Sequence, residues 1–386
     1  MSPQRSERRR ANFVAEWFGH RVYPDVAATP DSLADQRAQR CPFLSDATGS
    51  DRRCVKLPRS LGVCTISSTS NGPRQDWLVC PYRGLDLGLL RNAASRLFAV
   101  PDDDALVLVA ASVLADASAA TTFRNSVAMG KTALVYFQNK LGGEISISST
   151  DRSPEFSFDV TMVHIEAERR SGGLALGRYG IFEIQTMDFH GSYSHAVGNL
   201  QDALRLHPRD FGGNVRSNPN WLSEGVEGPN IANVFKRTFY QMMVKFQIGN
   251  HEQAAGCVFA ISQSVWDSWQ RHLARPELVP HSDGTVRLAR PSAYLREPPP
   301  AWIYVFDIQS SPDASPNRLS LATVIGTDAP SLSHYALDVA PAAALAEGGS
   351  IDRLRATIAS RLSAYFPELR PERARARAPR PLGPER

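Results

Sequence analysis

The sequence predicts an α/β protein in which helices flank a mixed β-sheet. Short apolar runs with the length of buried strands alternate, from Gly84 onward, with longer segments in which apolar residues recur at helical spacing. No internal repeat is found. Strands interleaved with helices in this way are typical of a sheet covered by helices.

The individual elements follow from these patterns. Helical spacing predicts helices over 85–97, 119–141, 230–248, 264–273 and 351–366. Apolar or alternating runs predict strands over 105–110, 144–148, 257–261 and 302–308. We expect Asn230 to cap the start of the long helix and Gly249 to close it.

Two more β-rich runs, 156–165 and 179–185, are separated by a polar stretch that contains Gly172, Gly173 and Gly177. A pair of β-rich runs joined by such a stretch is typical of a hairpin or a short meander. The sequence therefore predicts that these two runs are neighbours in the sheet.

The composition is that of an ordinary globular protein, with 42% hydrophobic and 21% charged residues among 386. We expect four parts: an N-terminal segment with a cysteine module (1–83), a main α/β core (84–310), a C-terminal extension with a helix (311–366) and a basic, disordered tail (367–386). The tail is either a solvated end or an arm that grips phosphates.

Charge and hydropathy restrict the classes of partner. The net charge of +4 permits DNA binding without arguing for it. The longest apolar stretch, Ala105–Ala115, is shorter than the roughly 20 residues of a membrane span. The N-terminus lacks a secretory apolar region, so we expect a cytoplasmic protein without a membrane partner.

A candidate catalytic site lies on the two paired β-rich runs. Asp159 stands between apolar neighbours, where an unpaired carboxylate would be costly. Glu183 and Gln185 are two residues apart and therefore project from one face of a strand. If the runs pair, Asp159 and Glu183 would meet around Mg²⁺, which prefers oxygen ligands, and Gln185 would orient the attacking water. Glu144 is either a further ligand or a surface residue. Such spacing often arises by chance.

Four of the five cysteines, Cys41, Cys54, Cys64 and Cys80, lie in a stretch (27–82) that is rich in Ser, Pro, Gly and Arg and has no long helical period. Their spacing is looser than a paired C-x-x-C zinc motif, so a metal site, two disulfides and unrelated buried thiols all remain open. A metal site is favoured because disulfides are rare in a reducing cytoplasm and this stretch otherwise lacks core residues. Tetrahedral thiolates suit zinc or iron. Cys257 is expected in the core.

Several longer stretches resemble the NotI-like type II restriction endonucleases of the PD-(D/E)xK superfamily, from about Ala11 to Ile308. They are ANFVAEWFGHRVYP (11–24), KLGGEISIS (140–148), SPEFSFD (153–159), EIQTMDFHGSY (183–193), NVFKRTFYQM (233–242) and AISQSVWDSWQRHLA (260–274). The resemblance implies a bacterial protein whose segment 84–310 is a catalytic and DNA-binding core of the PD-(D/E)xK fold. Asp159 and Glu183 would be its motif acids and Mg²⁺ its catalytic ion. Gln185 stands where the superfamily usually has Lys, and Phe158 stands where it has Pro. It also implies structural iron on the four cysteines, with zinc as second choice.

The resemblance further implies a restriction-modification enzyme that cuts double-stranded DNA at a G·C palindrome containing GGCC, with GCGGCCGC as one candidate. A palindrome suggests a two-fold homodimer, paired functionally with a DNA methyltransferase that it does not bind. Guanine is read best by basic side chains, although the charged residues of helix 230–248, Lys245 among them, are more often a solvated face. The candidate DNA contacts are Arg152, Glu155, Arg178, Lys236, Arg237, Gln241 and Arg271.

Two rival functions remain at this point. A sequence-specific DNA-binding protein with a structural metal would bind the same site without cutting it. A hydrolase that uses a pair of carboxylates, such as a glycosidase, would need no added cation.

Overall fold

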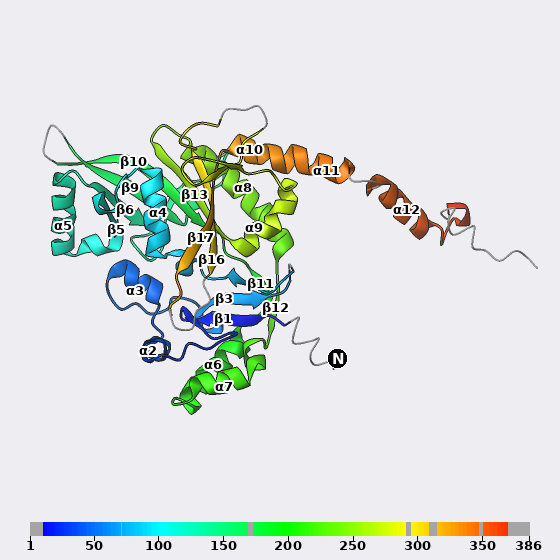
Figure 1. Ribbon diagram of the computed structural model, residues 1–386, viewed down its shortest axis with the longest axis horizontal. Coiled ribbons are helices and arrows are strands. Elements are labelled where there is room, and N and C mark those ends of the chain that lie inside the picture. Colours follow the sequence, from blue (N-terminus) through cyan, green and yellow to red (C-terminus); the bar gives the residue numbers. More distant parts are fainter. Residues whose placement is uncertain are drawn as a thin grey trace, which may run out of the picture.

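The computed structural model describes residues 11–70, 72–168, 173–290, 295–308, 315–346 and 350–369. The expected α/β class is confirmed, because these residues include a nine-stranded mixed sheet flanked by helices (Figure 1). Its strands, in spatial order, are β14 (Val279–Pro280), β15 (Val286–Arg287), β17 (Leu319–Thr327), β16 (Ala301–Ile308), β13 (Ala254–Ser262), β10 (Leu174–Ile184), β9 (Val160–Ala167), β6 (Thr132–Phe137) and β5 (Leu106–Ala110).

The centre of the sheet consists of β10, β13 and β16, which run parallel to one another. Alternate residues of β13 face opposite cores: Val258 packs with α4 (Leu87–Leu97), whereas Phe259 packs with α8 (Ile231–Gly249) and α9 (Gln263–Trp269). The strands expected at 105–110, 257–261 and 302–308 are present, and Cys257 is fully buried as expected.

The helix expected over 119–141 is wrong beyond its first half. The helix α5 (Ala117–Ala128) is followed by Gly130, whose φ of +76° belongs to the left-handed region that glycine adopts at helix ends. The next residues, Thr132–Phe137, form β6 between β5 and β9. The spacing of the apolar residues there predicts a helix, but these residues form a strand that pairs with β5 on one side and β9 on the other.

The N-terminal region contains more regular secondary structure than its composition predicts. Its four-stranded sheet contains β2 (His20–Arg21), β1 (Phe13–Trp17), β3 (Val63–Ser68) and β4 (Gln75–Leu78), and the helices α2 (Pro30–Ala38) and α3 (Pro42–Thr48) lie between β2 and β3 in the chain. The expectation that this stretch lacks core residues is wrong. Apolar residues of β1 and β3 pack against α6 (Ser194–Leu206) and α7 (Phe211–Ser217), which come from much later in the sequence (Figure 1).

The two β-rich runs pair as predicted. Within the first run, β8 (Phe156–Phe158) pairs with β7 (Ile145–Ile147), and β9 pairs antiparallel with β10. Asp159 occupies the bend between β8 and β9. After β10, the short strand β11 (Phe189–Gly191) pairs with β12 (Val226–Pro229), which leads into α8.

The long helix α8 begins at Ile231, with Asn230 at the capping position. The expected capping role of the Asn230 side chain is not seen, because that side chain makes no capping hydrogen bond, and Gly249 is the last helical residue. Within the described residues, no helix combines the length and apolar character needed to cross a membrane.

The C-terminal elements are α10 (Ala329–His334), α11 (Ala340–Ala346) and α12 (Ser350–Leu362), and the last two extend away from the layered body in Figure 1. The main sheet continues beyond the boundary expected at residue 310, since β17 pairs with β16. The expected tail lies almost entirely outside the described residues.

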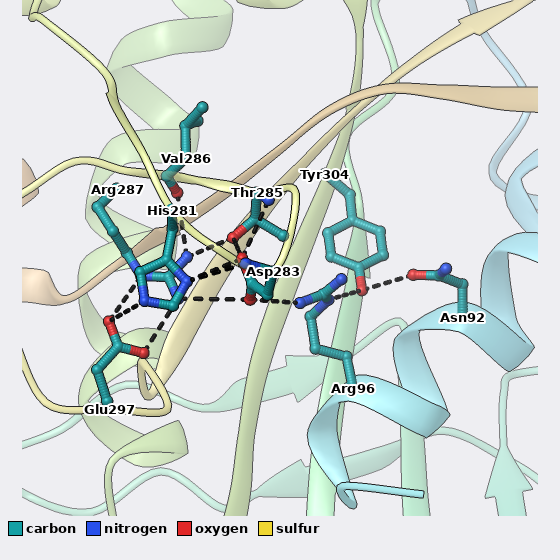
Figure 2. Close-up of polar contacts among 9 residues, drawn as sticks. All are labelled: Asn92, Arg96, His281, Asp283, Thr285, Val286, Arg287, Glu297 and Tyr304. Carbon is teal, nitrogen blue, oxygen red and sulfur yellow. Dashed lines mark hydrogen bonds and ion pairs between the residues drawn. The ribbon is translucent and has the colours of Figure 1, made fainter. Parts of the chain in front are cut away.

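A cluster of charged side chains connects the β14–β15 edge of the sheet to α4 (Figure 2). Arg287 donates to Glu297 through Nε at 2.7 Å and Nη2 at 3.0 Å. Arg96 reaches from α4 to Asp283 at 3.4 Å. The guanidinium groups of Arg96 and Arg287 lie 4.7 and 5.2 Å from the ring centre of Trp302. These contacts hold the edge of the sheet that lies opposite β5 in the strand order.

Candidate active site

A pocket of about 320 Å³ lies where the end of β10, the bend before β9 and one side of α8 meet. Its lining includes Asp159, Glu183 and Gln185, together with Arg237 and Lys245 of α8. Side chains from the two β-rich runs therefore meet in one cavity, as the sequence predicted.

The pairing of β9 with β10 brings the two acids together. Val160 is opposite Phe182 in the antiparallel register. Asp159 precedes Val160 and Glu183 follows Phe182, so the two acids occupy the next pair of positions at the same end of the two strands. The Asp159 N–H donates to Glu183 Oε1 at 3.2 Å, and the Ile184 N–H donates to Asp159 Oδ2 at 2.9 Å. Backbone donors thus fix one oxygen of each carboxylate.

Burial makes both carboxylates difficult to ionise. Glu183 is 3% exposed, and burial, followed by the charge of Asp159, raises its pKa to about 8, against the opposing effect of Lys245. Burial also raises the pKa of Asp159, against the Ile184 N–H and Lys245. Two adjacent buried carboxylates with raised pKa values favour the binding of a cation between them.

Lys245 is a site residue that the sequence analysis did not single out. The interpretation of the charged residues of α8 as a solvated face is wrong here, because Lys245 is only 5% exposed and forms an ion pair with Glu183 Oε2. Its ammonium also lies 5.7 Å from the ring centre of Phe158. Arg237, Gln241 and Lys245 follow one another at four-residue steps, which places them on one side of the helix. That spacing was the available signal.

Gln185 is oriented by neighbours on two sides. Thr238 Oγ1 donates to Gln185 Oε1 at 2.6 Å, and Gln185 Nε2 donates to the Thr186 carbonyl. A primary amide has two hydrogens and two acceptor lone pairs. Each end of the Gln185 amide therefore retains one bonding position, and because Gln185 lines the pocket, this suits the expected orientation of a water molecule.

The other expected residues divide into two groups. Glu155, Arg237 and Gln241 line the same pocket, and Lys236 is exposed beside Arg237. Three exposed arginines do not line this pocket: Arg152, Arg178 and Arg271.

Arg178 borders a separate groove of about 720 Å³ whose lining is mostly apolar. Glu144 is exposed just before β7 and lies outside the pocket lining. Its negative charge nevertheless contributes to the raised pKa of Asp159.

The four N-terminal cysteines gather around one core. Cys41, Cys64 and Cys80 are buried in it, and Cys54 packs against it. A hydrogen bond with the Cys64 thiol lowers the pKa of Cys80 to about 6, whereas burial raises the pKa of Cys41 to about 12. All four are free thiols.

In the parts of the chain that the structure describes, no three or more His, Cys, Asp or Glu side chains are arranged as a metal-binding group. At the pocket, the third polar position is the amide of Gln185, which leaves a pair of carboxylates. The cysteine thiols are neighbours that influence one another's pKa, but their side chains are not placed in a coordinating arrangement.

No protein-family model matches the chain, and no curated protein matches it.

Proposed function

We propose that the chain is a type II restriction endonuclease that cuts both strands of DNA in a Mg²⁺-dependent hydrolysis, on a core of the PD-(D/E)xK kind. One observation carries this proposal: Asp159 and Glu183, from adjoining strands, meet in a solvent-accessible pocket that is also lined by Arg237 and Gln241. Phosphodiester hydrolysis of DNA requires acidic side chains that bind a cation, next to basic and amide side chains that contact the polyanion.

The residues present fit Mg²⁺. The pocket offers carboxylate oxygens from Asp159 and Glu183 and is large enough for the several waters that this ion retains. Mg²⁺ bound there would stabilise negative charge on the scissile phosphate and lower the pKa of the attacking water.

Three residues of the chain prepare this chemistry. The Gln185 amide, held by Thr238, positions the water by hydrogen bonding, and it cannot serve as a base. The Lys245 ammonium offsets the charge of Glu183 in the buried part of the site. The oxygen of this water bonds to phosphorus as the P–O3′ bond breaks, the water releases a proton to solvent, and the departing O3′ takes up a proton from water, which leaves a 5′-phosphate and a 3′-hydroxyl.

The finer parts of the proposal follow from the resemblance. They are a G·C palindrome containing GGCC as substrate, a homodimer with one site per strand, a cytoplasmic location and a cognate methyltransferase that protects the host site. The exposed basic residues Lys236 and Arg237 of α8 support the nucleic-acid part of this proposal.

Incubation of the protein with supercoiled plasmid rich in G·C sites tests the proposal. We expect linear product with Mg²⁺ and none after addition of EDTA. Intact plasmid despite specific binding would instead support the non-catalytic DNA-binding protein. Hydrolysis of a glycoside that resists EDTA would support the carboxylate-pair hydrolase.

The raised pKa of Glu183 predicts that the protein without divalent cation loses stability as the pH rises. An unfolded glutamate ionises near 4.5, whereas Glu183 retains its proton up to about pH 8. Between these values the folded state binds more protons than the unfolded state, so the free energy of unfolding falls with increasing pH, in total by on the order of 5 kcal/mol.

Urea unfolding at pH 5 and pH 8 measures this fall. Glu183→Gln, which cannot ionise, should show a correspondingly smaller one, and Mg²⁺ at pH 8 should stabilise the wild type more than the variant. The same pH dependence in both proteins would contradict the assignment.

We also propose a structural metal, iron or else zinc, on Cys41, Cys54, Cys64 and Cys80. Four thiols that gather around one core support it, since tetrahedral thiolate sites suit either metal. Binding requires the cysteine side chains to rearrange, because the described thiols do not form a coordinating group.

Elemental analysis of the purified protein should therefore find about one iron or zinc per chain. In Cys64→Ser the metal should be lost, together with much of the stability of the N-terminal region. A metal-free wild type that is fully folded would refute the site.

A further inference from the structure

We infer that Asp188 and Arg237 act together as the reader of one G·C base pair in the major groove. The inference rests on the proposed function, since it takes double-stranded DNA as the substrate. Both residues line the pocket that holds Asp159 and Glu183, so a duplex whose backbone enters that pocket would pass them.

The two side chains form an ion pair that folding does not require. Arg237 Nη1 lies 3.1 Å from Asp188 Oδ2, with the side chains 73% and 65% exposed. Ion pairs this exposed contribute little to stability, because water screens them and both side chains lose freedom. Substitutions at either position should therefore leave the fold intact.

The backbone that carries the pair is nevertheless held firmly. The Met187 N–H donates to the Leu78 carbonyl at 2.7 Å, and the Asn230 N–H donates to the Asp188 carbonyl at 2.9 Å. Phe189 then pairs with Pro229 in the β11–β12 ladder. Asp188 is thus tied to the start of the helix that carries Arg237, which fixes the pair relative to the catalytic carboxylates.

Contacts with the site residues also fix the position of α8, which carries Arg237. Thr238, next to Arg237, donates to Gln185 Oε1 at 2.6 Å, and Lys245 pairs with Glu183. Any base pair that the Asp188–Arg237 pair contacts consequently has a defined position relative to the phosphate in the pocket.

The polar groups of the pair match the edge of a G·C base pair. In the major groove this edge presents two acceptors, guanine N7 and O6, followed by one donor, cytosine N4. After its bond to Asp188, Arg237 retains further N–H donors for the two acceptors, and Asp188 Oδ1 remains to accept from the cytosine amino group. An A·T pair places the adenine amino group where guanine has O6. This donor would face the N–H donors of Arg237, so one hydrogen bond would be lost.

A contact with the DNA backbone alone fits less well. A phosphate oxygen would gain from Arg237 but would be repelled by Asp188, whereas a G·C edge uses both side chains. Charge complementarity therefore favours the bases over the phosphates for this pair.

Cleavage of a randomised duplex library with Mg²⁺, followed by sequencing of the ends, tests the inference. In Arg237→Ala and Asp188→Asn we expect the preference for G·C at one base pair of each half-site to fall about 10- to 100-fold, with the other positions retained. Binding of Asp188→Asn to non-specific DNA should rise, since one negative charge is removed. Arg205→Ala, in an equally exposed pair with Asp202 on α6, should keep the wild-type preference.

Each other outcome overturns the inference. An unchanged consensus in both variants, or a loss spread evenly over all positions, would show that the pair reads no base while the endonuclease assignment stands. A wild type that neither binds nor cuts DNA would remove the inference together with the proposed function.

Discussion

Asp159→Asn is expected to slow DNA cleavage by at least about 1000-fold, because loss of a cation ligand removes several kcal/mol of transition-state stabilisation. The fold should persist, since the asparagine oxygen can still accept the hydrogen bond that Ile184 N–H gives to Asp159 Oδ2. DNA binding should be equal or tighter, because one negative charge leaves the pocket. Single-turnover cleavage and gel-shift assays measure the two effects separately.

Asp202→Asn provides the control, as Asp202 is an exposed carboxylate on α6 and does not line the pocket. It should cut at the wild-type rate. Cleavage by Asp159→Asn within tenfold of that rate would remove Asp159 from the mechanism.

Lys245→Met is expected to have the second-largest effect, on both stability and activity. It leaves the buried Glu183 without its cation, and breaking a buried ion pair in this way costs about 3–5 kcal/mol. Lys245 lowers the pKa of Glu183, so without added Mg²⁺ the loss of stability should grow as the pH rises through 8, and cleavage should fall by about 100-fold. Lys236→Met, on the exposed side of the same helix, should change stability by less than about 0.5 kcal/mol.

A double variant separates the structural role of Lys245 from its role in the reaction. Lys245→Met combined with Glu183→Gln leaves no unpaired buried charge, so urea unfolding should show most of the lost stability restored. Cleavage should not recover above the level of Lys245→Met, because the proposed cation ligand Glu183 is missing. A double variant as unstable as Lys245→Met would indicate that Lys245 acts through packing and not through its charge.

The parts of the site that could be predicted from the sequence are those set by local pattern. Asp159 and Glu183 lie on runs whose alternation and apolar content indicate strands, and a short connection makes such strands neighbours. The fold class follows from the same alternation of elements. Gln185 follows from the two-residue period of a strand.

Residues brought in by tertiary packing could not be predicted in this way. Lys245 lies 62 positions after Glu183, and only the packing of α8 against β10 and β13 brings them together. Asp188 was not predicted, because its proposed role in reading a base pair depends on its ion pair with Arg237, 49 positions away. Arg152, Arg178 and Arg271 were chosen by charge alone, which does not say on which side of the sheet a side chain lies.

The errors in the fold have a similar origin. Spacing alone extended α5 through Thr132–Phe137, because short apolar runs fit either a helix or a buried strand. The polar composition of 27–82 concealed a core whose other half, α6 and α7, comes from beyond residue 193.

We propose that Asp159 and Glu183 together hold a divalent cation in the pocket beside α8. Titration of Mn²⁺ into the protein, followed by electron paramagnetic resonance at pH 8, measures this binding. We expect saturable binding in the wild type and in Asp202→Asn, and binding at least about tenfold weaker in both Asp159→Asn and Glu183→Gln. Equal binding by all four proteins, or none by the wild type with DNA present, would contradict it.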